Sequence, residues 1–201
     1  MAKVPRTRRK TGRPAPGRLR IVAGKWRRRL LPVAAVDGLR PTAERIRETL
    51  FNWLANDIDG ARCLDLCAGS GALGFEALSR GAASAVLVEI SPAALRALQE
   101  SRDTLGADDA DIVAADVQSW LATAATAQFD IVFVDPPYAA ALQSELCRLL
   151  VQNGWLADRA LVYVEHPRTG PGPDLPADWR ILRDKTAGAV RYLLAGTGNN
   201  D

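Results

Sequence analysis

An acid, two prolines and a tyrosine follow directly after the apolar run 131–134, in the segment IVFVDPPY. Proline fixes φ at about −65° and has no N–H, so the backbone after Asp135 is stiff and offers only hydrogen-bond acceptors. The Asp135 carboxylate and the Pro136 carbonyl can together accept both hydrogens of an exocyclic –NH₂ group. This grip would turn the nitrogen lone pair towards a reaction partner, and Tyr138 could stack on an extruded base that carries the amine. We therefore predict that Asp135, Pro136, Pro137 and Tyr138 form a catalytic amine-binding site.

A purely structural interpretation of these four residues is a Pro-Pro turn with a capping acid and a half-buried tyrosine. A glycine-rich segment earlier in the chain, CLDLCAGSGALG, argues against that interpretation. In it Gly69, Gly71 and Gly74 match the pattern GxGxxG, and Glu89 stands 20 residues after Gly69. Alone this match is weak, because many α/β proteins need a glycine turn between a strand and a helix.

Three acids near the glycines favour a cofactor other than a nicotinamide dinucleotide. Asp65 precedes the glycines, where an acid would repel a pyrophosphate but suits a ligand with a cationic amine. Glu89 suits a ribose with two free hydroxyls, and Asp116 in VAADV could accept from an adenine amino group. Each acid could instead be a helix N-cap, but three of them at successive strand ends together describe S-adenosylmethionine (SAM). The predicted cofactor-binding residues are Asp65, Ala68, Gly69, Ser70, Gly71, Glu89, Ile90, Asp116, Val117 and Asp135.

Methyl transfer from a sulfonium needs no metal, and the composition predicts none. In-line positioning at about 3 Å and acceptance of the positive charge that develops on nitrogen can lower most of the barrier. Cys63, Cys67 and Cys147 form no paired CxxC pattern, and one histidine cannot complete a zinc site. We expect Cys67 to be a small filler in the glycine loop rather than a nucleophile, and His166 to be held by backbone at a strand end.

The elements that must position these residues alternate between strands and helices. The predicted strands are 61–66, 84–90, 111–115, 130–134 and 160–165, and the predicted helices are 72–80, 92–105, 117–125 and 140–151. Such alternation predicts a parallel sheet with helices on both faces and ligands beyond the carboxyl ends of its strands. Two runs around Thr186–Gly188 predict a closing hairpin, which adds one antiparallel strand.

The N-terminal part has a different character. Residues 1–50 hold 15 Lys and Arg against three acids, whereas the rest of the chain holds 11 bases and 20 acids. We predict a basic flexible tail (1–17), an RNA-binding extension (18–56) with a hairpin around Gly24-Lys25 and a helix over 41–56, and a methyltransferase domain (57–198). The predicted RNA-binding residues are Arg20, Lys25, Trp26, Arg27, Arg28, Arg29, Arg40, Thr42 and Arg45, with Trp26 stacking on the RNA.

No stretch of about 18 apolar residues predicts a membrane span, and no apolar segment of the kind a secretory signal needs follows the basic N-terminus. We expect a cytoplasmic protein, without a membrane partner and monomeric.

The residues alone leave the methyl acceptor open, because adenine N6, cytosine N4, guanine N2 and a glutamine amide are all planar –NH₂ groups. A DNA or RNA adenine-N6 methyltransferase is one alternative, although no separate target-recognition domain is visible. A catalytically silent RNA-binding protein and a dehydrogenase are the others.

Several longer segments of the sequence are similar to those of one known family: RIVAGKWRRRLLPV, GLRPTAERIRETLFNWL, CLDLCAGSGALGFEALSRGA, IVFVDPPY, NGWLAD and LVYVEHP. With them, residues 18–195 resemble the bacterial 16S rRNA guanine-N2 methyltransferases of the RsmD type. The resemblance implies a Rossmann-like α/β fold, mostly a parallel seven-stranded sheet with an antiparallel C-terminal hairpin, and SAM as cofactor.

The resemblance also implies an activity and roles for single residues. The implied reaction is methylation of N2 of one guanine, guanine 966 in the family, in the 16S rRNA of the small ribosomal subunit or its assembly precursor. Asp65, Gly69 and Gly71 would cradle the methionine part, Glu89 the ribose and Asp116 the adenine. The segment 135–138 would hold the guanine, and Arg40, Pro41, Thr42 and Arg45 would border the site. Arg28 departs from the family, which commonly shows WRGR where this chain has WRRR.

Overall fold

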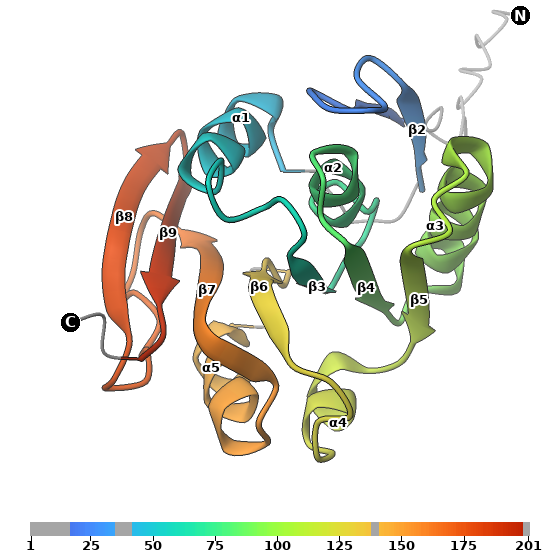
Figure 1. Ribbon diagram of the computed structural model, residues 1–201. Helices are drawn as coiled ribbons and strands as arrows, with labels where there is room; N and C mark the ends of the chain where they lie inside the picture. The colour runs from blue at the N-terminus through green and yellow to red at the C-terminus, as the bar shows by residue number, and fades with distance from the viewer. Residues whose placement is uncertain (1–16, 35–41, 138–140, 199–201) are drawn as a thin grey trace, which may run out of the picture.

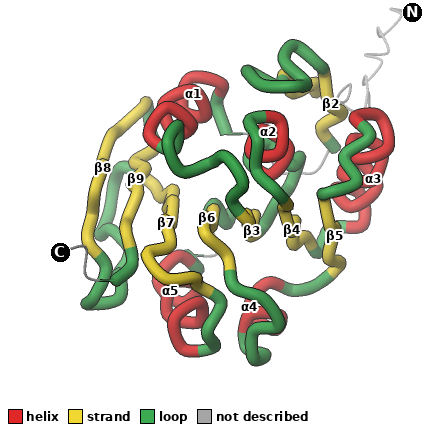
Figure 2. The backbone as a smooth tube through the Cα atoms, in the orientation of Figure 1, coloured by secondary structure: helices red, strands yellow, loops and turns green. Residues whose placement is uncertain are grey.

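A seven-stranded sheet with helices on both faces forms the body of the molecule (Figures 1 and 2). The computed structural model describes residues 17–34, 42–137 and 141–198. The sheet strands are β3 (Arg62–Leu66), β4 (Ser84–Glu89), β5 (Ala110–Ala114), β6 (Phe129–Val134), β7 (Leu156–Pro167), β8 (Arg180–Ala187) and β9 (Val190–Gly196). The helices are α1 (Glu44–Trp53), α2 (Gly74–Ser79), α3 (Pro92–Leu105), α4 (Val117–Leu121) and α5 (Gln143–Gln152). The predicted Rossmann-like α/β class is confirmed.

Two hydrophobic clusters, one on each face, hold the layers together. Along β6, Ile131 and Phe133 join the cluster beneath α1, α2 and α3, while Val132 and Val134 join the cluster above α4 and α5. Side chains of a strand alternate between the faces, so a continuous apolar run fits a strand that is covered on both sides. By the same alternation Asp135 continues the row of Ile131 and Phe133, and therefore points to the α1 side.

The strand order is β5-β4-β3-β6-β7-β9-β8, so the chain moves outwards from β3 in one direction and then returns to its other side through β6. Both neighbours of β3 run parallel to it. The loops after β3 and β6 therefore leave the sheet at the same edge and diverge there. This reversal is the position at which open α/β sheets bind ligands.

Element boundaries differ from the predictions where side chains intervene. Helix α4 ends at Leu121 rather than 125, because the Asn153 and Trp155 side chains donate to the Leu121 carbonyl at 2.9 and 3.1 Å. Strand β7 begins at Leu156, before the predicted 160, and has a register shift against β6. The start of the helix predicted over 140–151 lies partly outside the described residues, and α5 begins at Gln143.

The C-terminal hairpin adds the expected antiparallel strand, since β9 runs antiparallel to both β7 and β8. Its turn lies at Gly188 and Ala189 instead of Thr186–Gly188, because β8 pairs with β9 as far as Ala187 and Val190. Gly188 has φ +62°, which a tight two-residue turn requires at its first position and which glycine adopts without strain.

A small two-stranded sheet, β1 (Gly17–Arg20) and β2 (Leu30–Val33), carries the basic N-terminal segment. Its strands are joined by a broad loop, 21–29, rather than a tight turn at Gly24-Lys25. The loop lies against the end of α2: a Cβ at Gly24 would stand 1.7 Å from the Ser79 carbonyl oxygen, and Lys25 N–H donates to that oxygen at 2.7 Å. Glycine at position 24 is therefore required by close approach of two backbones.

In the part of the chain that the structure describes, no helix is both long and apolar enough to cross a membrane.

Candidate cofactor and amine-binding site

The glycine loop and the amine-binding segment begin at neighbouring positions of neighbouring strands. Leu66 of β3 is in register with Val134 of β6 and with Val88 of β4. The next residue of each strand is Cys67, Asp135 and Glu89, so the two acids flank the start of the glycine loop. A ligand in this loop and a group held by Asp135 would lie in one crevice.

The backbone of the loop has a shape that side chains would disturb. Gly69 and Gly71 have φ of +56° and +72°, and a Cβ on Gly71 would stand 2.5 Å from the Phe75 ring. Cys67 adopts φ +60°, and burial raises the pKa of its thiol to about 12, so a neutral side chain is expected there. Ala68 and Ser70 are also buried. A side chain is thus excluded at Gly71, so the backbone there can approach its neighbours closely, as a ligand-binding loop requires.

Asp65 is buried beneath this loop and lacks a cation among its partners in the described residues. Its Oδ2 accepts from Gly74 N–H at 2.9 Å, at the start of α2. Burial raises the pKa of Asp65 well above its usual value, the Gly74 hydrogen bond works in the opposite direction, and the charges of Asp135 and Glu89 raise it further. An ammonium group would stabilise the charged carboxylate, so this position fits the amine of SAM.

Glu89 is held by three backbone N–H groups. Its Oε2 accepts from Gly69 at 2.8 Å, and its Oε1 accepts from Ile90 at 2.9 Å and Ser91 at 2.8 Å. A carboxylate has about four lone-pair positions, so about one remains for a ligand. The expected pair of bonds to two ribose hydroxyls is therefore reduced to one well-oriented acceptor. Ile90 beside it is a large apolar residue with 63% exposure, and Val117 is buried.

Asp116 caps a helix. It is exposed, and its Oδ1 accepts from Ser119 N–H at 2.9 Å at the start of α4. This hydrogen bond lowers the pKa of Asp116. The helix cap that the sequence analysis gave as the alternative role of Asp116 is thus present. An adenine contact would need the other carboxylate oxygen, and that contact stays a prediction.

Asp135 is half-buried at the end of β6 and accepts from Thr42 Oγ1 at 2.9 Å. Burial raises the pKa of Asp135 to about 7, the charge of Glu165 adds to the rise, and the Thr42 hydrogen bond opposes it. Pro136 is buried and Pro137 exposed. Tyr138 lies outside the described residues.

Thr42 and Glu165 change the predicted residue set. Thr42 was predicted as an RNA contact, but it is buried and bonded to the catalytic candidate. The sequence analysis missed Glu165 as a site residue, although an acid in the apolar run LVYVEHP was a signal. His166 is buried with Nδ1 2.9 Å from the Pro167 carbonyl oxygen, as expected of a residue held by backbone.

The predicted stacking of Trp26 on RNA is wrong in this structure. Trp26 is 9% exposed within the hydrophobic cluster beneath α1 to α3, and Lys25 Nζ covers its ring at 4.2 Å from the centroid. The alternation of tryptophan with arginine suggested an accessible ring, but the loop turns the indole inwards. The remaining basic candidates of the described residues are exposed: Arg20, Lys25, Arg27, Arg28, Arg29 and Arg45. Arg40 is outside the described residues.

Glu76 is a further buried acid that the sequence did not single out. Its carboxylate accepts from the N–H groups of Val22 and Ala23 at 2.8 and 3.0 Å and pairs with Arg47 at 3.2 Å and Arg80 at 2.8 Å. It thus fixes the loop 21–29 to α2, the helix whose first residue, Gly74, donates to Asp65.

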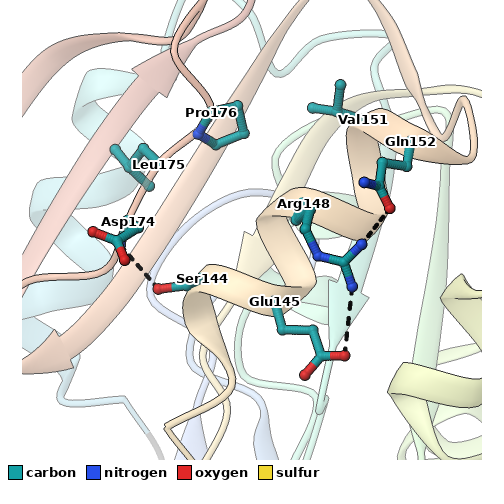
Figure 3. A pocket seen from close by; sticks show the side chains of 8 residues that line it. All are labelled: Ser144, Glu145, Arg148, Val151, Gln152, Asp174, Leu175 and Pro176. Atoms are coloured by element: carbon teal, nitrogen blue, oxygen red, sulfur yellow. Dashed lines mark hydrogen bonds and ion pairs between the residues drawn. The ribbon is translucent and has the colours of Figure 1, made fainter.

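A hollow of about 770 Å³ lies elsewhere, over α5 (Figure 3). It is lined by Ser144, Glu145, Arg148, Val151, Gln152, Asp174, Leu175 and Pro176. None of the predicted site residues lines it, and Arg148 there is already paired with Glu145 and Gln152. The described residues also contain no group of three or more potential metal ligands.

Comparison with known proteins gives consistent matches over most of the chain. The family model described as conserved hypothetical protein 95 matches residues 19–196. The ribosomal RNA small subunit methyltransferase D of Escherichia coli K12 is 51% identical over 178 residues, which is 89% of each chain. The protein of the same name from Haemophilus influenzae is 42% identical over 183 residues, 90% of this chain and 94% of its own.

A solved structure agrees with these sequence matches. The Escherichia coli protein yhhF superposes with a TM-score of 0.84 at 47% identity, over 90% of this chain and 99% of that chain. The expected resemblance is confirmed: this chain belongs to the conserved hypothetical protein 95 family, the family of the RsmD-type methyltransferases.

Proposed function

We propose that this protein transfers the methyl group of SAM to the exocyclic N2 of one guanine in the 16S rRNA of the small ribosomal subunit, guanine 966 in the family's numbering. The coarser part, a SAM-dependent methyltransferase that acts on rRNA, follows from the family. One observation of this structure carries the proposal: Asp135, an acceptor fixed by Thr42, stands beside the start of the glycine loop on the adjacent strand.

The cofactor supplies a methyl group on a cationic sulfur, which leaves as the neutral thioether when the new N–C bond forms. Asp65 would hold the amine of its methionine part, and Glu89 would accept from one ribose hydroxyl. The closely packed backbone around Gly71 would keep the sulfonium in the crevice. These residues bind and orient; the methyl transfer itself needs no covalent intermediate with the protein.

Asp135 and the Pro136 carbonyl would accept the two amine hydrogens. This contact would reduce the delocalisation of the nitrogen lone pair into the ring and direct it to the methyl donor. As the bond forms, positive charge develops on nitrogen, and the adjacent carboxylate stabilises it. The proton that nitrogen loses goes to Asp135 or to water.

The exposed cations of the N-terminal hairpin and α1 would hold the RNA backbone. Arg20, Lys25, Arg27, Arg28 and Arg45 are exposed, as phosphate contacts require. Because a base inside a helix cannot reach a crevice at a sheet edge, the target guanine must leave its stack. The reaction belongs in the cytoplasm, where small subunits are assembled, with one copy of the chain per substrate.

The test is methyl transfer from labelled SAM to undermodified 30S subunits, naked 16S rRNA and duplex DNA, followed by nucleoside mass spectrometry. N2-methylguanosine at one position of 16S rRNA is the expected product. Label found only in adenine, or only in DNA, would replace the proposal by an adenine-N6 methyltransferase.

A further inference from the structure

Arg47 of α1 is a buried cation that binds acceptors in three different segments of the chain. The residue is 1% exposed. Its Nη2 donates to the Arg20 carbonyl oxygen at the end of β1 at 2.9 Å, and its Nη1 donates to Glu76 Oε2 of α2 at 3.2 Å. Its Nε donates to the Thr42 carbonyl oxygen, ahead of α1, at 3.3 Å. Because a guanidinium is planar and rigid, its nitrogens hold these three segments at fixed relative positions.

Thr42 connects this arrangement to the site. It is buried, its carbonyl accepts from Arg47, and its hydroxyl donates to Asp135 Oδ2 at 2.9 Å. Ala43, the residue directly before α1, has no side-chain acceptor with which to cap the helix. The start of α1 is therefore held by the Arg47 guanidinium, which binds the Thr42 carbonyl from within the same helix.

The charges around Asp135 differ from those around Arg47. The charge of Glu165 on β7 raises the pKa of Asp135, the charge of Asp135 raises the pKa of Asp65 on β3, and the Thr42 hydrogen bond lowers the pKa of Asp135. Arg47 interacts by charge with another set of groups: Glu76, Glu44, Glu48 and Arg80. A substitution that keeps the positive charge at position 47 therefore tests the position of Thr42, and not a direct charge effect on Asp135.

We propose that Arg47 is a positioning residue for the methyl transfer: by holding the Thr42 carbonyl against β1 and α2, it sets where the Thr42 hydroxyl meets Asp135. The two-stranded sheet β1–β2 and the catalytic carboxylate are then connected through one side chain, because Arg47 also binds the last residue of β1. Since Arg47 is buried, it acts through Thr42 and not as an RNA contact. The inference rests on the role proposed for Asp135 in methyl transfer to RNA.

Arg47→Lys separates position from charge. Lysine keeps the positive charge beside Glu76, but its single nitrogen cannot reach the three acceptors that a guanidinium binds with three nitrogens. With undermodified 30S subunits, kcat should fall by up to about 100-fold, the effect of misplacing a reacting group by about 1 Å. The acidic limb of kcat/KM should move to higher pH by about 0.5–1 pH unit, part of what one hydrogen bond to a charged group is worth. SAM affinity should stay at the wild-type value.

Arg80→Lys is the matched control. Arg80 pairs with the other oxygen of the same carboxylate, Glu76 Oε1, at 2.8 Å. In the described residues its side chain hydrogen-bonds to Glu76 and not to Thr42. This variant disturbs the same buried ion-pair group without touching the Thr42 carbonyl, so its acidic limb should coincide with that of the wild-type protein. A limb that moves equally in Arg80→Lys and Arg47→Lys would overturn the inference.

A double-variant cycle tests the route through Thr42. If Arg47 acts through the Thr42 hydroxyl, Arg47→Lys moves the acidic limb in the wild-type background but not in Thr42→Val, where the hydroxyl is already gone. Thr42→Ser keeps a hydroxyl and should preserve the response to Arg47→Lys. An equal response in the wild-type and Thr42→Val backgrounds would show that Arg47 does not act through this hydroxyl.

Thermal unfolding and titration with SAM show which variants are folded. If Arg47→Lys does not fold, Arg47→Gln, which keeps a donor and buries no charge, takes its place and should move the limb in the same direction. If the wild-type protein forms N2-methylguanosine while the folded variant keeps the wild-type limb, the inference is wrong and the proposed function stands. If the wild-type protein methylates a different base, the proposed function is wrong, and the same comparison of limbs still tests Arg47. If it transfers no methyl group to RNA, both are wrong.

Discussion

At the scale of single residues, the site depends on acids whose charge is costly where they stand. Asp65 and Asp135 both have raised pKa values because they are removed from water near other carboxylates. Perturbed acids in a crevice are typical of functional sites, because catalysis and the binding of charged ligands use shifted pKa values. Their titration therefore gives direct tests of the roles proposed for them.

Asp135 should set the acidic limb of the pH profile. Its pKa in the folded protein is about 7, above the ordinary value of 3.8. The protonated acid cannot stabilise positive charge on nitrogen, so kcat/KM should fall as the pH drops below about 7. Thr42→Val removes a bond that stabilises the charged form, which raises the pKa and should move the limb to higher pH. Profiles of kcat/KM between about pH 5.5 and 9, a range that brackets this pKa, measure the position of the acidic limb in both proteins. An acidic limb that lies at lower pH in Thr42→Val than in the wild-type protein would contradict the assignment.

Asp135→Asn gives the complementary measurement. The amide keeps the size of the side chain but cannot accept positive charge, so we expect kcat to fall about 100-fold or more. SAM affinity should fall much less than the rate, because Asp65 and Glu89 are proposed to make the main polar contacts to the cofactor and Asp135 only borders it. Isothermal titration with SAM and single-turnover methyl transfer separate the two effects. A variant that transfers at the wild-type rate would remove Asp135 from the chemistry.

Asp65 should release a proton when SAM binds. Burial raises the pKa of Asp65 in the free protein, and the ligand ammonium would favour the charged carboxylate and lower the pKa again. Titrations of SAM in buffers of different ionisation enthalpy measure the number of protons released. Asp65→Asn should abolish this release and weaken binding about 10–100-fold, the effect of losing one hydrogen bond to a charged group. A proton uptake by the wild-type protein would contradict the assignment.

At the scale of elements, α2 links the cofactor loop to the basic hairpin. Its first residue, Gly74, donates to Asp65, and Glu76 in its first turn accepts from Val22 and Ala23 in the loop 21–29. Burial lowers the pKa of Arg47, the ion-pair partner of Glu76, and the charge of Glu76 works in the opposite direction. One short helix thus fixes the basic loop 21–29 relative to the glycine loop.

Glu76→Ala should therefore be strongly destabilising. It leaves Arg47 buried without its carboxylate and two backbone N–H groups without their acceptor, so the free energy of unfolding should fall by about 3–5 kcal/mol. Denaturant unfolding at neutral pH measures it. The exposed pair of Glu145 with Arg148 is the control, because Glu145→Gln should change stability by less than about 1 kcal/mol. A loss for Glu76→Ala as small as that of the control would contradict the structural role.

What the sequence predicted well at this scale is local. The strand ends at Asp135 and before the glycine loop were predicted correctly, because the length of an apolar run and the conformation of glycine are properties of short segments. The sequence could not give contacts between distant segments. The burial of Trp26 depends on α2, the end of α4 depends on Asn153 and Trp155, and Glu165 becomes a site residue only through its register with β6.

At the scale of the whole molecule, positive charge is concentrated in the first 50 residues, while the rest of the chain has more acids than bases. The hairpin β1–β2 with its arginines lies on the α2–α3 side, and the edge strand β8 lies at the opposite end of the sheet (Figure 1). A polyanion attracted by the first 50 residues approaches an otherwise acidic body, which repels phosphates elsewhere. The direction of RNA approach is thus proposed to be set by the hairpin.

Removing two charges from the hairpin should change the salt dependence of RNA binding. Arg27 and Arg28 are exposed, whereas Arg29 already donates to the Thr104 carbonyl at the end of α3 and is left intact. For Arg27→Ala/Arg28→Ala, the slope of log K against log salt should become less negative by about 1–2, because each phosphate contact releases about one counterion. Arg180→Ala/Arg183→Ala on β8 removes the same charge at the far edge and should leave the slope unchanged. Filter binding of 16S rRNA at several salt concentrations measures these slopes. Equal slopes for both double variants would mean that the net charge of the protein, rather than the hairpin, attracts the RNA.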